Sequence, residues 1–359
     1  MPDLLKNMFN YESLHEIAST IQSVYTEFKI DEFLKSILDE TWNDLGLKGR
    51  CRKISISLGE YLPVEYAEAL DILEKAVSGF SFAFFFPDFV EVYGQNETNW
   101  DLSISALERN TEYWSSEFAV RAFIIKDEKR MMAQMFAWSK HKNEHVRRLA
   151  SEGCRPQLPW SQALTEFKKD STPILPILEQ LKTDSSLYVR KSVANNLNDI
   201  SKTHPDLVAN LAKDWYGVNE YTNWIVKHGC RTLQKKGNRD VLAIFGYNDI
   251  ASIDIQDFDL DTTTVSMGGD ITFSFSILTK ETTKVRLEYG IDYVKSNGKR
   301  KRKIFKISEV LLKENQKKFY EKKHSFADVS VRKHYSDIHS IVLIINGIER
   351  DKLDFELNV

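Results

Sequence analysis

Apolar residues recur at spacings of three and four along the first two-thirds of the chain, with polar residues between them. The pattern is clear in residues 10–28 (NYESLHEIASTIQSVYTEF), 30–45 (IDEFLKSILDETWNDL) and 63–77 (PVEYAEALDILEKAV). Apolar side chains at this spacing share one face of an α-helix and can be buried there together. The pattern therefore predicts amphipathic helices throughout residues 1–240.

A second, longer period accompanies the helical one from Ser115 onward. Four segments place a polar residue before a Val-Arg or Val-Lys pair: SSEFAVRAFI, NEHVRRLASEG, SSLYVRKSVANNL and TNWIVKHGCRTL. The basic residues of these pairs, Arg121, Arg147, Arg190 and Lys227, are 26, 43 and 37 residues apart. A period near 40 residues with two helices per unit is typical of HEAT-like repeats, which stack into a solenoid with a concave binding face.

After about Asn248, apolar and polar residues begin to alternate. Four segments show the alternation, and turn signals such as SNGK and NG separate them: VSMGGDITFSFSILT, KVRLEYGIDYV, KRKIFKISEVLL and HSIVLIINGIERDKLDFELNV. Alternation of period two predicts β-strands. We therefore expect a mainly α chain, with a HEAT-like α-solenoid in residues 1–247 and a small all-β immunoglobulin-like sandwich in residues 248–359. The immunoglobulin assignment depends on strand number and length, since no Cys-Trp-Cys core is present.

The composition is that of an ordinary globular protein, with 42% hydrophobic and 28% charged residues. Three widely spaced cysteines argue against a disulfide framework or a cysteine-rich zinc site and favour a reducing compartment. The most apolar run, residues 79–90, contains Pro87 and is too short to span a bilayer. We therefore expect a cytoplasmic protein that does not associate with membranes.

Charge is distributed unevenly although the net charge is only −3. Residues 140–240 carry 17 Lys and Arg against 11 Asp and Glu, whereas residues 1–139 carry 13 against 23. A basic middle segment suits a polyanionic partner, but a solvated helical face would have the same composition.

Cations of three kinds are candidates for contacts with DNA phosphates. The motif cations either brace neighbouring repeats through acidic residues or contact DNA; they are Arg121, Arg147, Arg190 and Lys227. Four further cations are additional to the motif and are better candidates for phosphate contacts: Arg148, Arg155, Lys191 and Arg231. The segment SNGKRKRK predicts a cationic hairpin tip that is either solvated or bound to a phosphate backbone, and it contains Lys299, Arg300, Lys301 and Arg302.

Several enzyme classes leave no signature in the sequence. The chain has no phosphate-binding glycine loop, dinucleotide fingerprint or Gly-x-Ser-x-Gly elbow. The segment HKNEH, His141 to His145, matches a zinc pattern by letter, but both histidines would have to lie on one continuous helix. Because Asn143 is expected to cap a new helix, we expect no metal site there and no cofactor elsewhere.

Three carboxylates of successive repeats are expected on one basic surface. When the helices are aligned on Val146 and Val189, Glu152 and Asn195 take equivalent places. Asp199 follows one turn later, and Glu117 lies one turn before Val120. Stacked repeats place such helices side by side, so Glu117, Glu152 and Asp199 either form a functional cluster or simply brace arginines.

Four segments together resemble the AlkC branch of the HEAT-like alkylpurine DNA glycosylases: PDFVEVYG, ALERNTEYWSSEFAVRAFI, HVRRLASEGCRPQLPW and YVRKSVANNLNDISKTHPDLV. The resemblance covers most of residues 1–245 and includes the appended β-module. It implies a solenoid that wraps duplex DNA and excises alkylated bases, above all 3-methyladenine. It also implies that Glu152 and Glu117 are the active-site carboxylates, with Trp160 and Asp199 lining the same cleft.

From this resemblance we expect a monofunctional DNA N-glycosylase that acts on double-stranded DNA containing alkylated bases, leaves an abasic site and works as a monomer. A base methylated at N3 is already a good leaving group, so a fixed carboxylate that stabilises positive charge on the sugar would suffice. The alternative is a non-catalytic HEAT-like scaffold that binds DNA or an acidic protein and uses its carboxylates only to brace arginines.

Overall fold

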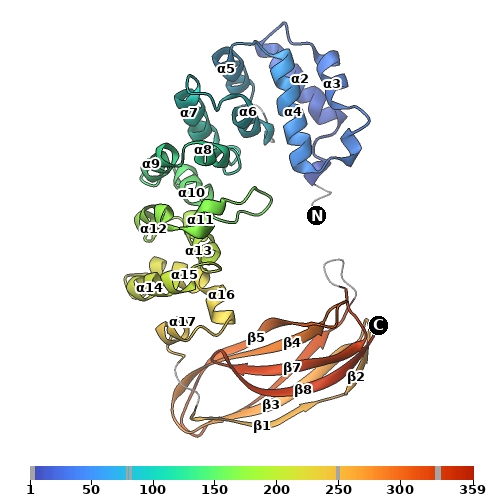
Figure 1. Cartoon of the computed structure of the whole chain (residues 1–359), viewed down its shortest axis with the longest axis vertical. Helices are drawn as coiled ribbons and strands as arrows, with labels where there is room; N and C mark the ends of the chain where they lie inside the picture. The colour runs from blue at the N-terminus through green and yellow to red at the C-terminus, as the bar shows by residue number, and fades with distance from the viewer. Residues whose placement is uncertain (1–4, 78–79, 81–82, 248–250, 328–332) are drawn as a thin grey trace. The chain divides into compact units, whose positions relative to one another are not determined.

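The computed structural model describes residues 5–77, 80, 83–247, 251–327 and 333–359 (Figure 1). Residues 79, 81 and 82 of the apolar run, and residue 248 at the predicted domain boundary, lie outside these ranges. Contacts group the chain into two compact units: one comprises residues 1–204 and 217–229, and the other residues 205–216 and 230–359. Contacts group residues 230–247 with the β-strands. The domain boundary expected after residue 247 therefore stays a prediction.

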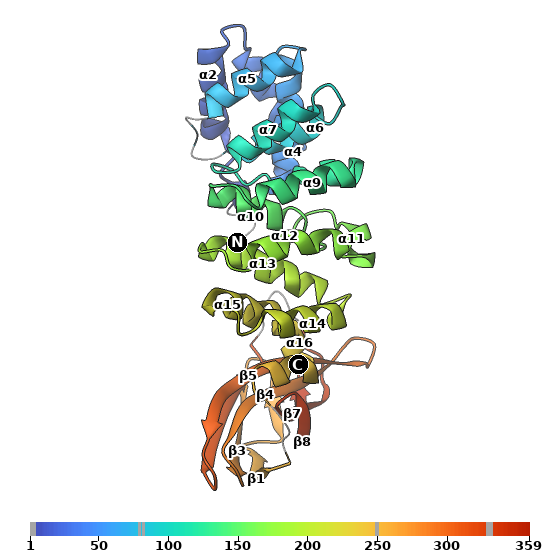
Figure 2. The same cartoon turned by 90° about the vertical axis from the view of Figure 1, so that its left-hand side faces the viewer.

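The first unit is helical, as the sequence predicts, and its later helices follow one another along the stack in Figure 2. They are α2 (Tyr11–Val24), α3 (Ile30–Ile37), η1 (Trp42–Asp44), α4 (Leu47–Tyr61), α5 (Tyr66–Val77), α6 (Phe85–Tyr93), α7 (Trp100–Asn110), α8 (Val120–Lys126), α9 (Glu128–Trp138), α10 (Glu144–Glu152), α11 (Thr165–Lys169), η2 (Thr172–Ile174), α12 (Leu175–Leu181), α13 (Leu187–Ile200) and α15 (Glu220–Gly229). Among the described helices, none combines the length and the apolar character needed to cross a bilayer.

The repeats form two layers of helices. In Figure 1, α7, α9 and α12 lie in one layer, and α8, α10 and α13 lie in the other. Within the layers α9 packs on α12, and α10 packs on α13, which in turn packs on α15. The stack confirms the predicted HEAT-like solenoid.

Local sequence explains where the helices of the second layer begin and how closely they pack. The Asn143 side chain accepts a hydrogen bond from the backbone N–H of His145 and caps α10, as the sequence predicts. Gly153 follows α10, and a Cβ atom there would lie 2.5 Å from the side chain of Val120, on α8. Only a glycine therefore lets α10 approach α8 this closely.

The described residues of the second unit form a two-sheet β-sandwich and three short helices. The helices are α14 (Pro205–Trp215), α16 (Arg231–Lys235) and α17 (Arg239–Ile244). The strands are β1 (Ile253–Leu260), β2 (Thr264–Ser266), β3 (Asp270–Thr279), β4 (Thr283–Val294), β5 (Arg300–Leu312), β6 (Lys317–Ser325), β7 (Asp337–Ile345) and β8 (Ile348–Asn358). One sheet has the order β1-β3-β6, and the other has the order β2-β8-β7-β4-β5.

The core of the sandwich lies between the two sheets. Phe273 and Phe275 of β3 pack with Leu287 of β4 and Leu343 of β7, and all four are at most 1% exposed. In β3 and β4 these apolar side chains alternate with more polar ones, which explains the period-two pattern there, whereas Leu343 of β7 lies between the buried Val342 and Ile344. The Arg286 guanidinium of β4 donates a hydrogen bond to Gln234 of α16 at 2.9 Å and so joins that helix to the sandwich.

Candidate active site

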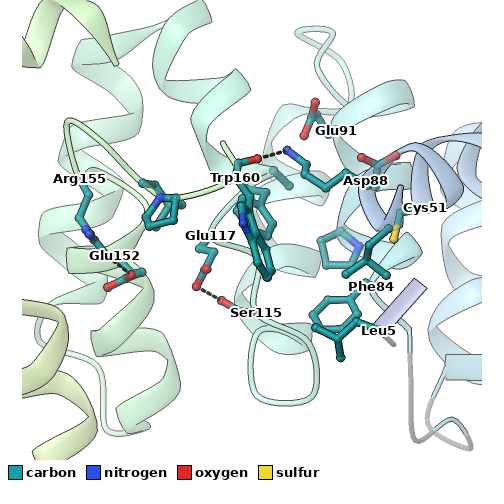
Figure 3. Close-up of a pocket in the computed structure, with 17 residues that line it drawn as sticks. Leu5, Cys51, Phe84, Asp88, Glu91, Ser115, Glu117, Glu152, Arg155 and Trp160 are labelled. Carbon is teal, nitrogen blue, oxygen red and sulfur yellow. Dashed lines mark hydrogen bonds and ion pairs between the residues drawn. The ribbon is translucent and has the colours of Figure 1, made fainter. Parts of the chain in front are cut away.

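A pocket of about 390 Å³ opens in the first unit beside the turn that precedes α8 and the loop that follows α10 (Figure 3). Most of its lining is apolar, and the charged residues among that lining are Lys48, Asp88, Glu91, Glu117, Glu152 and Arg155. Two of the three predicted carboxylates, Glu117 and Glu152, therefore line one pocket together with Trp160. An apolar pocket with a few converging polar groups is the usual form of a ligand or active site.

Charges of alternating sign run from one repeat to the next at this pocket, and we name the six residues the ion-pair chain: Glu117, Arg148, Glu152, Arg155, Asp199 and Lys202. Along this chain, successive N–O distances are 2.5, 3.7, 2.5, 2.8 and 2.7 Å. The three carboxylates balance the three cations, so the ion-pair chain carries no net formal charge. Stacking of α8, α10 and α13 brings these groups together from distant parts of the sequence.

The two pocket carboxylates differ in how many of their oxygens are occupied. Glu152 is only 5% exposed, and Arg155 and Ser192 donate to its Oε1 and Oε2 atoms at 2.5 and 2.6 Å. Glu117 is bound through Oε2 alone, to Arg148 at 2.5 Å and to the Ser115 hydroxyl at 2.7 Å. Within the described part of the chain no residue donates a hydrogen bond to Oε1 of Glu117. Glu117 thus retains an oxygen that can face a substrate or a water.

The two arginines of the ion-pair chain, Arg148 and Arg155, are firmly protonated. Burial by itself lowers the pKa of Arg148, but the charges of Glu117 and Glu152 outweigh it and raise that pKa above its ordinary value. For Arg155, burial is likewise outweighed by Glu152 and Asp199, so its pKa is also raised. Permanent positive charge therefore lies on both sides of Glu152.

Asp199 is farther from the pocket than the sequence predicts. It is 4% exposed and is not among the residues that line the pocket. Arg155 binds its Oδ2 atom at 2.8 Å and Lys202 binds its Oδ1 atom at 2.7 Å. Asp199 therefore lies behind Arg155 and orients that guanidinium, which corrects the expectation that Asp199 lines the same cleft.

Trp160 is the one exposed tryptophan of the seven, with 64% of its surface accessible. The backbone N–H of Ser161 bonds to the Leu158 carbonyl at 3.2 Å, so Pro159 and Trp160 form the centre of a four-residue turn. The φ angle of Trp160 is 63°. Proline followed by a residue with positive φ is the pattern of a type II turn, whose third position favours glycine. A tryptophan there strains the backbone, and strain of this kind concentrates at functional sites.

The Val-Arg arginines have contacts within the protein, which favours bracing over DNA contact, the two alternatives that the sequence left open. Arg121 is 2% exposed and donates to the carbonyls of Gly153, Arg155 and Gln162 at 2.6–3.0 Å. Burial lowers its pKa to about 10. These contacts hold both ends of the loop that carries Trp160.

Arg147 and Arg190 brace neighbouring repeats, which is the alternative that the sequence left open. Arg147 binds both oxygens of Asp184, at 2.6 and 3.1 Å. Arg190 donates to the carbonyls of Asp184 and Ser185 at 2.9 and 2.7 Å and lies over the Tyr221 ring at 4.1 Å. Both guanidiniums are therefore occupied within the protein.

The other predicted phosphate contacts are divided between the ion-pair chain and the surface. Arg148 and Arg155 belong to the ion-pair chain, where carboxylates bind their guanidiniums. Exposed side chains are found at three helical positions, Lys191, Lys227 and Arg231, of which Lys191 follows the occupied Arg190 directly on α13. Exposed cations remain candidates for phosphate contacts.

The cationic hairpin tip is shorter than the sequence suggests. Strand β5 begins at Arg300, so only Lys299 of the four predicted cations lies in the turn. Arg302 binds Asp292 at 2.7 and 2.8 Å and Glu349 at 2.6 Å, which makes it part of the sheet. Arg300 donates to Ser340 at 2.9 Å. Lys299 and Lys301 are exposed and are the two better candidates for DNA contacts.

Sequence reasoning missed three residues that shape the pocket. Ser192 binds Glu152, Ser115 binds Glu117, and Lys48 donates to the Trp160 carbonyl at 3.0 Å. The two serines lie in the repeat segments, but serine is too common to single out by spacing. Lys48 lies 112 residues before its partner, so no local pattern connects them.

No group of three or more potential metal ligands occurs among the described residues. In the HKNEH segment, the His141 ring accepts from the backbone N–H of Asn143 and precedes the start of α10, whereas His145 lies in its first turn. The two histidines are therefore not on one continuous helix, as predicted from the cap.

Comparison with known proteins gives matches along the whole chain. A family model described as "DNA alkylation repair enzyme" matches residues 93–233. Another, described as "Uncharacterised protein YhaZ, C-terminal Ig-like domain", matches residues 254–359 and confirms the predicted immunoglobulin-like fold. The chain is 48% identical over 355 residues to "Uncharacterized protein YhaZ" of Bacillus subtilis (strain 168), which covers 98% of this chain and 99% of that protein.

One solved structure is similar over nearly the full length. It is Pseudomonas fluorescens alkylpurine DNA glycosylase AlkC bound to DNA containing an abasic site analog. The TM-score is 0.94 at 38% sequence identity, and the match covers 99% of both chains. The order of solenoid and sandwich is thus the same in the two proteins.

Proposed function

The chain belongs to the family of DNA alkylation repair enzymes that contains the alkylpurine DNA glycosylase AlkC, and from this premise we propose that it hydrolyses the N-glycosidic bond of alkylated bases in duplex DNA. The substrate class is a small cationic lesion of the 3-methyladenine type. The product is an abasic site in an intact strand. The observation that carries the proposal is the pair of carboxylates, Glu117 and Glu152, that line one pocket beside the exposed Trp160.

The chemistry needs few groups. A base methylated at N3 carries a positive charge and leaves readily, so the barrier comes mainly from the cationic sugar that remains. A carboxylate fixed near C1′ stabilises this charge, and Oε1 of Glu117 can also orient the attacking water. Such a group contributes about 3–4 kcal/mol, or a few hundredfold in rate. No metal ion and no covalent lysine is part of this proposal.

The rest of the ion-pair chain fixes the carboxylates in place. Arg148 lies between Glu117 and Glu152, and Arg155 lies between Glu152 and Asp199. Because the arginines and Asp199 are already ordered, little reorganisation is required when charge develops on the sugar. Trp160 offers a flat apolar surface to the sugar or base and excludes water from the charged groups.

The test is release of free base from methylated DNA. A duplex carrying N-methylpurines is incubated with the full chain, the released bases are separated by chromatography, and alkali then converts abasic sites to strand breaks. We expect 3-methyladenine in the supernatant, with alkali-dependent breaks and no breaks before alkali. An unmethylated duplex is the control for substrate. Binding to the methylated duplex without base release would favour the non-catalytic scaffold.

A further inference from the structure

A long side chain of the N-terminal helices binds the loop that carries Trp160. Lys48, on α4, donates a hydrogen bond from Nζ to the Trp160 carbonyl at 3.0 Å (Figure 3). The same ammonium lies over the ring of Phe118, 4.7 Å from its centroid. Phe118 follows Glu117 directly in sequence. Lys48 therefore contacts both the turn that presents Glu117 and the loop that presents Trp160.

Neither helix stability nor substrate charge explains a lysine at this position. Lys48 is the second residue of α4, whose first turn has no acidic residue, and a cation near a helix N-terminus opposes the helix dipole. The proposed substrate is also a cationic lesion, which an ammonium at this pocket would repel. Lys48 favours the charged form of Glu91 electrostatically, but the ion-pair partner of both nearby carboxylates is Arg52, at 2.9 Å from Asp88 and 2.5 Å from Glu91.

The contact with Trp160 stabilises a strained backbone conformation. The Trp160 backbone is strained at a φ of 63°, and its side chain is mostly exposed, so its own burial contributes little to holding this conformation. A hydrogen bond from an ammonium to the carbonyl of the strained residue fixes the peptide plane and so the direction of the indole. Arg121 secures the two ends of the loop, and Lys48 secures its centre.

We propose that Lys48 is a positioning residue of the excision reaction, which holds the Trp160 carbonyl and thereby keeps the indole beside Glu117. The inference rests on the proposed glycosylase function. Lys48 acts through Trp160 and touches neither the sugar nor the leaving base.

The test is a double-mutant cycle between Lys48 and Trp160, measured as single-turnover release of 3-methyladenine at saturating enzyme. Lys48→Met removes the donor and keeps the aliphatic stem, and we expect excision to slow about tenfold. In a Trp160→Ala background, the same change is expected to alter the rate by less than about twofold, because the group it positions is gone. Lys48→Arg, which can still donate to the carbonyl, is expected to recover most of the rate.

The control is Lys53→Met on the same helix, whose ammonium binds Thr41 at 2.8 Å and which does not line the pocket. It removes an equal charge from α4 and is expected to leave excision unchanged. Equal losses from Lys48→Met with and without Trp160 would overturn the proposal. So would a weaker duplex affinity with a shallower salt dependence, since Lys48 would then be a phosphate contact. Absence of base release from the unmutated chain would refute the glycosylase function instead.

Discussion

Replacement of Glu117 by Gln isolates the contribution of one negative charge at the pocket. The amide has nearly the same shape, and its oxygen can still accept the hydrogen bond from the Ser115 hydroxyl. Arg148 loses its partner at 2.5 Å but keeps Glu152 at 3.7 Å. Glu117→Gln therefore changes charge while it leaves most of the local contacts in place.

The expected effects on rate and on stability differ in size. Loss of the carboxylate removes charge stabilisation in the transition state, worth about 3 kcal/mol, so excision is expected to slow on the order of a hundredfold. The folded state loses one hydrogen bond to a charged group, which contributes about 1.5–3 kcal/mol when buried. Since the Glu117 side chain is still 14% exposed, we expect a loss of stability at the lower end of that range.

The assay is single-turnover release of 3-methyladenine with enzyme in excess, accompanied by binding to a duplex that holds a stable abasic analogue. Affinity is expected to stay within about threefold, because the carboxylate acts mainly in the transition state. Ser115→Ala is the control for local contacts, since it removes the neutral hydrogen bond to Glu117 and keeps the charge, and it is expected to lose less than about fivefold. Base release within threefold of the unmutated chain would refute the role of Glu117 as the reacting carboxylate.

Three further predictions follow from the pocket and the β-sandwich. Glu152→Gln is expected to nearly abolish excision while duplex affinity stays within a few-fold. It is also expected to lower the free energy of unfolding by about 1–3 kcal/mol, because it leaves buried arginines without their partner. Undiminished base release would contradict this prediction. Trp160→Gly and Trp160→Ala are both expected to slow excision, but the glycine variant should be about 1 kcal/mol more stable in urea unfolding, since glycine adopts positive φ freely; the opposite order would show that the turn is relaxed. Neutralising Lys299 and Lys301 together should weaken duplex binding and reduce the slope of log affinity against log salt concentration by up to about two. Arg302→Ala should instead destabilise the sandwich. An unchanged salt slope in the double variant would show that the hairpin is not part of the DNA interface.

Periodicity was sufficient to predict the architecture of the chain. The Val-Arg segments located the repeats because Val146 and Val189 must both be buried at the same place in each unit, and they are 2% and 0% exposed. Alternation located the strands for the same reason. Burial imposes a repeating pattern on the sequence, and a repeating pattern can be recognised without coordinates.

The roles of individual cations could not be predicted in this way. Arg121 and Lys227 both directly follow the valine of their repeat segment, yet Arg121 is buried against carbonyls and Lys227 is exposed. Whether an arginine meets a carbonyl, a carboxylate or solvent depends on the neighbouring repeat, which is tens of residues away. The same holds for the hairpin, where Arg302 finds Asp292 only because β4 and β5 pair in one particular register.

The distribution of the ion-pair chain over successive repeats limits how proteins of this kind can change in length during evolution. Solenoids commonly gain or lose whole units, because each unit contacts only its neighbours. An extra helix pair inserted between α8 and α13 would separate Glu117 from Asp199 by a further interhelical spacing of about 8–10 Å and break the ion-pair chain at the point of insertion. Insertions and deletions are therefore expected in this family before residue 117 or after residue 202, and the number of residues between these positions should be nearly constant.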